Sequence, residues 1–147
     1  MKARTYLAFD FGRKHIGVAV GRAESRLAQA LDTVAAHNHR PDWTHISRLI
    51  DEWRPCALVV GLPLNMDDSE NEMTRAAKRF GNRLHGRYNL PVHMVDERLT
   101  SVVARNALVE AGVPVKRHKG KLDKLAAQTI LQAFLDDQLG PSHATQH

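Results

Sequence analysis

The hydrophobic pattern of the first forty residues predicts a β-sheet that begins as an antiparallel meander. Residues 4–11 and 15–22 are two apolar runs separated by a tight turn at 12–14, a pattern typical of a β-hairpin. Residues 31–35 predict a third strand because Val and Thr favour extended backbone, and the polar residues 37–40 predict a loop.

A helix and a buried strand are expected next. Apolar side chains recur at helical spacing after Pro41, which we expect to open the first helix, and Pro55 ends it. Residues 57–61 form a short continuous apolar run, typical of a strand buried on both faces. Ser69 and Glu72 have the spacing of a capping box for a second helix.

The remaining chain alternates in the same way. Residues 91–95 predict a strand, and Thr100 or Ser101 can cap a third helix that ends near Gly112. Residues 113–120 predict a basic loop, and an apolar stripe over 122–134 predicts the last helix. The order β-β-β-α-β-α-β-α-α predicts an α/β fold with a mixed sheet and helices on both faces.

Composition favours a nucleic-acid partner. The chain has 147 residues and a net charge of +5, so we expect one domain over residues 1–139, a flexible tail at 140–147 and a polyanionic ligand. Cys56 is the only cysteine, which excludes an intrachain disulfide and a cysteine-based zinc site. No apolar run approaches membrane-spanning length, so we expect a cytoplasmic protein with no membrane partner.

Three acidic residues stand out by position. Asp10 interrupts an apolar strand, where an ionised carboxylate is costly unless something compensates it. Glu97 follows the strand at 91–95, and Asp123 falls in the first turn of the expected last helix. The first two can meet beyond the carboxyl ends of their strands if those strands are neighbours, and the last helix can bring Asp123 over the same edge. Singly, each can instead make a structural hydrogen bond, an ion pair or a helix-dipole interaction.

Together these carboxylates predict a metal site that handles phosphate. Oxygen ligands suit Mg²⁺ or Mn²⁺, and two such ions roughly 3.5–4 Å apart can hydrolyse a phosphodiester in line. Basic residues beside the three carboxylates are expected to contact phosphate, although such a charge run is also typical of a solvated face. They are Arg13, Lys14, Arg98, Lys116, Arg117, Lys119 and Lys121.

The loop over 61–69 allows two interpretations. Asn65 and Ser69 could contact substrate, and Asp67 could assist the metal site. The same polar residues could equally serve to connect a strand to a helix and cap it.

Four segments resemble motifs of the YqgF (RuvX) nuclease family and occur in the family's order. The segments are Asp10-Phe-Gly-Arg-Lys-His-Ile-Gly-Val-Ala-Val-Gly21, Gly61-Leu-Pro-Leu-Asn-Met-Asp67, Asp96-Glu-Arg-Leu-Thr-Ser101 and Lys121-Leu-Asp-Lys-Leu-Ala-Ala127. The resemblance implies an RNase H-like fold with a five-stranded mixed sheet whose first three strands are antiparallel. It also implies a divalent-metal nuclease with ligands at Asp10, Glu97 and Asp123. We expect Thr100 and Ser101, in the third segment, to contact substrate.

The family is associated with 5′-end maturation of pre-16S ribosomal RNA, which implies pre-rRNA and ribosomal particles as partners. It was earlier linked to Holliday junctions, so a resolvase of branched DNA stays open, as does a non-catalytic RNA-binding assembly factor. An Asp-x-Gly turn also occurs in sugar kinases, but this chain is too short for their two lobes.

The chain departs from the family in one loop. Asp68 stands where the family has Gly, and Asn71-Glu72 stands where Gly-Pro is common. Asp67, Asp68 and Asp96 are the candidates for a fourth carboxylate.

Overall fold

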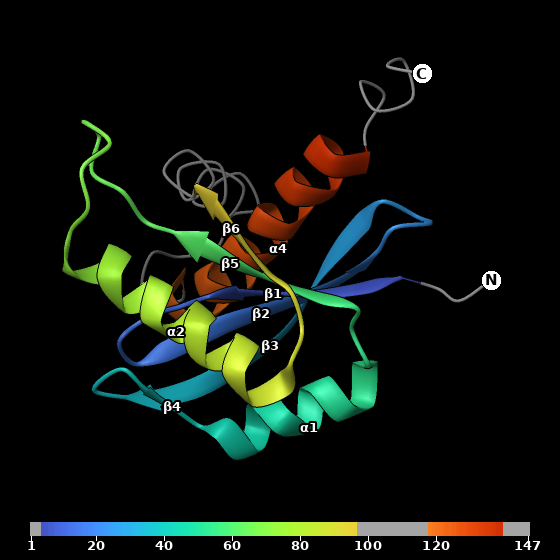
Figure 1. Cartoon of the computed structure of the whole chain (residues 1–147), viewed down its shortest axis with the longest axis horizontal. Helices are drawn as coiled ribbons and strands as arrows, with labels where there is room; N and C mark the ends of the chain where they lie inside the picture. The colour runs from blue at the N-terminus through green and yellow to red at the C-terminus, as the bar shows by residue number, and fades with distance from the viewer. Residues whose placement is uncertain (1–3, 97–117, 140–147) are drawn as a thin grey trace.

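The computed structural model describes residues 4–96 and 118–139, with side chains for 4–96 and 124–137. In chain order its strands and helices are β1 (Thr5–Asp10), β2 (His15–Arg22), β3 (Leu27–His37), β4 (Arg40–Pro41), α1 (Trp43–Trp53), β5 (Ala57–Leu62), α2 (Glu72–Tyr88), β6 (Val92–Asp96) and α4 (His118–Leu139). The six strands form one sheet in the spatial order β4-β3-β2-β1-β5-β6 (Figure 1). Strands β1 to β4 pair antiparallel in succession, whereas β1–β5 and β5–β6 are parallel. The predicted mixed sheet is confirmed.

The expected number of five strands is wrong, because residues 37–40 are not a plain loop. Strand β3 turns back through Asn38 and His39, which have φ of 49° and 65°, and the chain pairs again as β4. Proline is tolerated in this short edge strand because it has no ladder hydrogen bond to donate there. Pro41 therefore belongs to β4, and Asp42 caps α1 instead by accepting a hydrogen bond from the His45 N–H at 3.2 Å.

The cap of α2 also differs from the prediction. Asn71 and Thr74 form the capping box: each side chain accepts a hydrogen bond from the other residue's backbone N–H, at 3.0 Å in both cases. Ser69 stays in the preceding loop, where its hydroxyl donates to Asp67. The capping box of α2 is therefore an Asn-Thr pair, two residues after the predicted Ser69-Glu72 pair.

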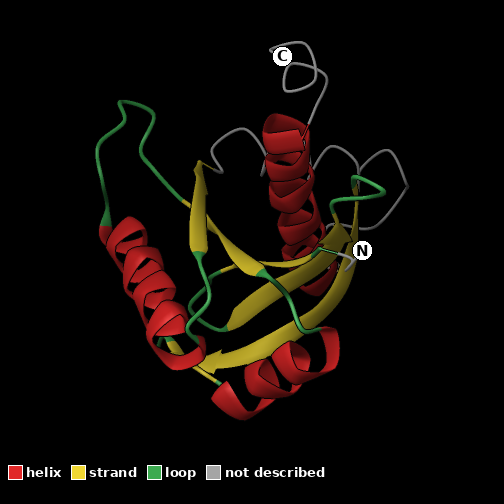
Figure 2. Ribbon diagram, turned by 45° about the vertical axis from the view of Figure 1, so that its right-hand side comes forward, coloured by secondary structure: helices red, strands yellow, loops and turns green. Residues whose placement is uncertain are grey.

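The sheet is covered on both faces, as predicted: α1 and α2 cover one face and α4 covers the other (Figure 2). Leu7 and Phe9 of β1 belong to the core beneath α1 and α2, and the alternating Tyr6 and Ala8 belong to the core beneath α4. This alternation follows from the two-residue period of side chains along a strand. Strand β5 is buried along nearly its whole length, as its continuous apolar sequence predicted.

Helix α4 packs directly on the antiparallel part of the sheet. A Cβ built on Gly21 of β2 would lie 3.1 Å from the side chains of Leu131 and Leu135, so glycine permits this close approach. Gln132 accepts a hydrogen bond from the Ala28 N–H at 3.0 Å and ties the helix to β3. Among the described helices, none is both long enough and apolar enough to cross a membrane. The helix predicted after Thr100 lies outside the described residues.

Candidate active site

Asp10 ends β1, a central strand of the sheet. Its side chain is half-buried, and Asp10 pairs with Gly17 in the register of β1 and β2. Because Tyr6 and Ala8 face α4, the strand alternation places Asp10 on the α4 face as well. The carboxylate thus stands at the carboxyl edge of the parallel strands, where α/β folds form their sites.

The strand that leads to Glu97 is not the neighbour of β1. Strand β5 lies between β1 and β6, and all three are parallel, so their carboxyl ends share one edge. Two strand spacings separate β1 from β6 by about 10 Å. Asp96 is exposed at the end of β6, and Glu97, the next residue, lies outside the described part of the chain.

Helix α4 runs antiparallel to β1 and brings position 123 toward the same edge. Tyr6, near the start of β1, packs edge-on against Phe134 with ring centroids 5.4 Å apart. Four residues of strand from Tyr6 to Asp10 span about 13 Å. Eleven residues of helix from Phe134 back to position 123 span about 17 Å. Figure 1 shows α4 crossing behind the sheet in the direction opposite to β1.

Position 123 lies in the second turn of α4, not in the first turn as predicted, because the helix begins at His118. Residues 118–120, expected to be loop, are helical. Position 123 shares the helix face of the buried Ala127 and Ile130, which pack on the sheet. Since the orphan N–H groups of a helix are confined to its first turn, a helix-dipole role explains Asp123 less well than first expected.

The basic residues predicted at the site are placed only in part. Arg13 and Lys14 are exposed in the turn after Asp10, and the Arg13 guanidinium lies 3.7 Å from the Glu72 carboxylate. Lys119 and Lys121 fall within the helical backbone at the start of α4. Arg98, Thr100, Ser101, Lys116 and Arg117 lie outside the described residues.

The loop between β5 and α2 is organised by its own polar side chains. Asp67 accepts hydrogen bonds from the backbone N–H of Ser69 at 3.0 Å and from its hydroxyl at 2.5 Å. Asn65 donates to the Ser69 hydroxyl at 2.9 Å and accepts from Asn71 at 2.9 Å. These bonds favour the structural interpretation of Asn65, Asp67 and Ser69.

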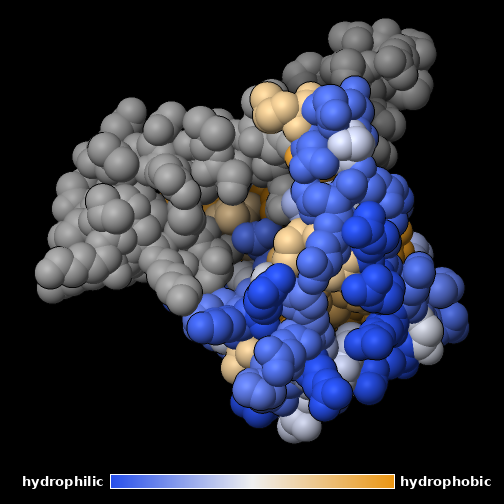
Figure 3. All heavy atoms as spheres, turned by 90° about the vertical axis from the view of Figure 1, so that its left-hand side faces the viewer, coloured by the Kyte–Doolittle hydropathy of each residue, from blue (hydrophilic) through white to orange (hydrophobic). Residues whose placement is uncertain are grey.

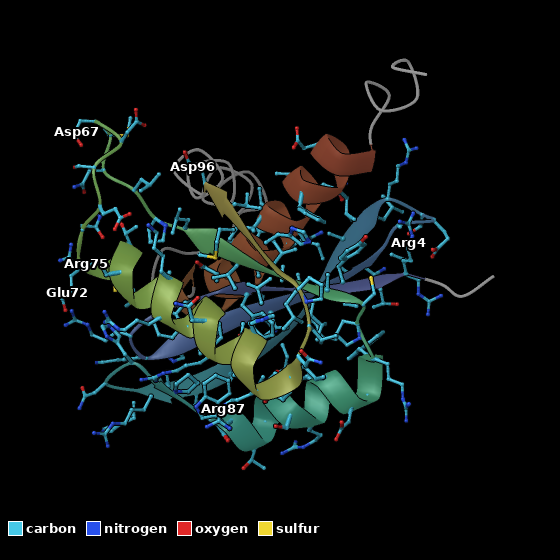
Figure 4. The ribbon with its side chains drawn as sticks, viewed as in Figure 1. Arg4, Asp67, Glu72, Arg75, Arg87 and Asp96 are labelled. Carbon is cyan, nitrogen blue, oxygen red and sulfur yellow. The ribbon has the colours of Figure 1, made fainter. Side chains whose placement is uncertain are left out.

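The departure at Asp68 has a conformational explanation. Its φ is 72°, in the left-handed region that glycine adopts freely and that Asp and Asn tolerate better than most residues. Figure 4 shows Asp67 at the tip of this loop, well away from Asp96 at the end of β6. The described residues contain no group of three His, Cys, Asp or Glu side chains that could hold a metal ion. Of the three predicted ligands, only the side chain of Asp10 belongs to that described set.

Arginines on α2 are the main feature that the sequence-based prediction missed. Arg75, Arg79, Arg83 and Arg87 recur every four residues and are all exposed. The spacing was visible in the sequence, but its meaning depends on what lies beside α2.

The mixed sheet with helices on both faces places the chain among RNase H-like α/β folds. The solved structure described as "T. thermophilus RuvC in complex with Holliday junction substrate" aligns with a TM-score of 0.56 over 94% of this chain and 97% of that chain. A second Thermus thermophilus RuvC structure aligns with a TM-score of 0.51 over 92% and 96%. Sequence identities of 18% and 16% mean that these likenesses show the fold alone.

The family is shown by sequence. Residues 4–137 match the family model described as "RuvX: Holliday junction resolvase", and the chain belongs to this family. A relative from Nitrosococcus oceani, named "Putative pre-16S rRNA nuclease", is 52% identical over 93% of this chain and 90% of its own length. A relative of the same name from Aeromonas hydrophila is 46% identical over 95% of this chain and its own full length.

Proposed function

We propose that this protein is a divalent-metal-dependent nuclease that processes the 5′ end of pre-16S ribosomal RNA, in the setting of ribosomal particles. The observation that carries the proposal is Asp10, a half-buried carboxylate at the carboxyl edge of a central strand, on the face that α4 covers. The substrate follows from the names of relatives that share about half of their residues with the chain over most of its length.

The donor set fits a hard cation. Asp10, Glu97 and Asp123 would hold Mg²⁺ or Mn²⁺, since carboxylate oxygens are the ligands these ions prefer. When bound, a pair of such ions supplies an activated water and stabilises the leaving oxygen. The chain itself contributes the rigid strand that fixes Asp10 and the helix that carries Asp123. Arg13 and Lys14, in the turn after Asp10, supply positive charge for a phosphate at this edge.

The test is cleavage of labelled pre-16S RNA by the wild-type protein and by Asp10→Asn, with Mg²⁺ or Mn²⁺ and with a chelator. Asp10→Asn removes the charge at nearly constant shape. We expect it to reduce the cleavage rate by more than the roughly 10–100-fold that loss of an outer-shell partner costs a metal site. Asp51→Asn is the matched control, because Asp51 is exposed on α1.

The outcomes separate the candidate functions. RNA cleavage that needs metal and is lost in Asp10→Asn, but not in Asp51→Asn, supports the proposal. Cleavage of a four-way DNA junction with the RNA left intact would replace it by a resolvase, the activity that the family description names. RNA that is bound tightly but never cut would indicate an assembly factor. Equal cleavage by Asp10→Asn would refute the role of Asp10.

A further inference from the structure

A row of four arginines follows one side of α2. Arg75, Arg79, Arg83 and Arg87 are each separated by four residues, about 6 Å along the helix axis, and all four are exposed. Figure 4 shows Arg75 near the start of α2 and Arg87 at its far end. Residues four apart are neighbours on a helix surface, so these four positions lie along one side of α2.

Among the described residues, the acids at and just before the start of α2 pair with bases outside the row. Lys78 pairs with Glu70, and Arg13 pairs with Glu72. No ion pair of Arg75, Arg79 or Arg83 is found within the described residues. Arg87 instead lies over the Trp43 ring, 4.1 Å from its centroid. Because like charges at this spacing destabilise a helix, a row without acidic partners among the described residues favours an anionic ligand.

A cavity beside the row brings more positive charge to the same place. Its volume is about 240 Å³, and its lining includes Arg40 and His39 from the β3–β4 hairpin and Arg79 and Arg83 from α2. The Phe11 ring, stacked on Phe80 at 4.7 Å, contributes to its wall. Three arginines thus line one concavity, and guanidinium is the side-chain group that binds phosphate with paired N–H donors.

The β3–β4 hairpin also contributes a buried polar atom to this region. His39 Nε2 is buried and has no hydrogen-bond partner among the described residues. A buried polar nitrogen without a partner is costly. The His39 N–H donates to the Arg13 carbonyl at 3.3 Å, which ties the hairpin to the turn that follows Asp10.

The cavity lies next to the candidate active site, on the opposite face of the sheet. Phe11 directly follows Asp10 in sequence, and its side chain belongs to the core beneath α1 and α2. A nucleic-acid strand that crosses the carboxyl edge of the sheet at Asp10 would therefore continue toward Arg40, Arg79 and Arg83. Figure 3 shows the molecule from the side toward which β1 runs, and the described residues on this side are mostly hydrophilic.

We propose that the α2 arginine row and this cavity bind the sugar–phosphate backbone of the nucleic-acid strand as it leaves the active-site edge, with one phosphate seated among Arg40, Arg79 and Arg83. This inference rests on the proposed nuclease function for the identity of the ligand. The contacts are to phosphate and carry no base specificity, so they position the strand and do not select its sequence.

The test compares two double variants that remove the same charge. Arg79→Gln/Arg83→Gln changes the cavity, whereas Arg22→Gln/Arg26→Gln changes exposed arginines at the β2–β3 turn, at the opposite end of β2 from the Asp10 edge. The probe is a fluorescein-labelled single-stranded RNA from the pre-16S 5′ leader. Binding is measured without divalent metal between about 50 and 200 mM monovalent salt, the range over which counterion release is steep.

Loss of two phosphate contacts on a single strand should reduce the slope of log K against log salt by about 1.4. The same model gives about 25-fold weaker binding at about 0.1 M salt. The control pair should change affinity no more than about twofold, as expected for charges without phosphate contacts. Arg79→Lys/Arg83→Lys keeps the charges and should restore most of the slope. Equal weakening by both Gln pairs would overturn the proposal, as would an unchanged slope in the cavity variant.

Cleavage kinetics distinguish failure of this inference from failure of the proposed function. If the protein cuts RNA, the cavity variant should raise KM with little change in kcat, because it loses uniform binding. Wild-type KM in that variant would refute the inference and leave the nuclease intact. Loss of binding in the cavity variant alone, in a protein that cuts no RNA, would support the binding surface and refute the nuclease. Melting temperatures equal to or above wild type would show that the variants are folded, because the substitution relieves repulsion.

Discussion

Phe80 is the residue on which the packing of α2 against the sheet most depends. It is 2% exposed, and its ring lies beside three other aromatic rings, two at the end of β1 and one in α1. The ring centroids lie 5.6 Å from Phe9, 4.7 Å from Phe11 and 5.8 Å from Trp43. Phe80→Ala would therefore leave a cavity between β1, α1 and α2, where β1 carries the candidate active site.

The expected cost follows from what the substitution removes. Burial of a phenylalanine contributes about 1.5–3 kcal/mol by transfer alone, and the unfilled cavity adds to that loss. Aromatic pairs contribute about 0.5–1.5 kcal/mol beyond their buried area. Phe80→Ala should thus lower the free energy of unfolding by about 3–5 kcal/mol. For a chain of 147 residues this corresponds to a fall in melting temperature of roughly 10–16 °C.

The assay is urea denaturation followed by far-UV circular dichroism, with Phe80→Leu as the matched control. Leucine keeps most of the apolar volume and should cost less than about half as much as alanine. The slope of unfolding free energy against urea should stay unchanged, since the same surface is exposed on unfolding. A loss below about 1 kcal/mol for Phe80→Ala would refute the close packing described for this cluster.

Two further predictions concern the other face of the sheet. Gly21→Ala should destabilise the protein by about 1–3 kcal/mol, because its Cβ would lie 2.9 Å from the Leu27 carbonyl oxygen of β3 and 3.1 Å from the Leu131 and Leu135 side chains of α4. An unchanged urea midpoint would contradict this close packing of β3 and α4 around Gly21. The pKa of Tyr6 is raised, first by burial and then by Cys56. Because the unfolded chain then ionises first, stability should fall as pH rises above about 10. Tyr6→Phe should reduce the fall in melting temperature that the wild type shows between about pH 8 and about pH 11.5. Parallel wild-type and Tyr6→Phe curves would show that Tyr6 is not the group responsible.

Local patterns in the sequence were sufficient to predict a strand or helix wherever the hydrophobic pattern was both periodic and long. The hairpin of β1 and β2, the buried strand β5 and the apolar side of α2 all follow from spacing alone, because burial imposes a period of two on strands and about 3.6 on helices. Asp10 could be recognised as unusual for the same reason, since a carboxylate breaks an otherwise apolar strand.

Short or competing signals were not sufficient. Strand β4 has only two residues, too few to show any period, so residues 37–40 were expected to be loop. Ser69 and Asn71 could each begin α2, and the choice depended on the Asp67 bonds that hold Ser69 in the loop. The start of α4 at His118 was also missed, because basic residues before the apolar stripe suggested a loop.

The sequence by itself determined which residues face a core, which segments extend or coil, and that Asp10, Glu97 and Asp123 were the acids to consider. Only the tertiary structure decided that β5 separates β1 from β6, and that Arg40 of the hairpin meets Arg79 and Arg83 of α2 around one cavity. The physical reason is that periodicity reports only the surroundings of one segment. Strand order, and which side chains meet at a cavity, depend on contacts between segments far apart in the chain.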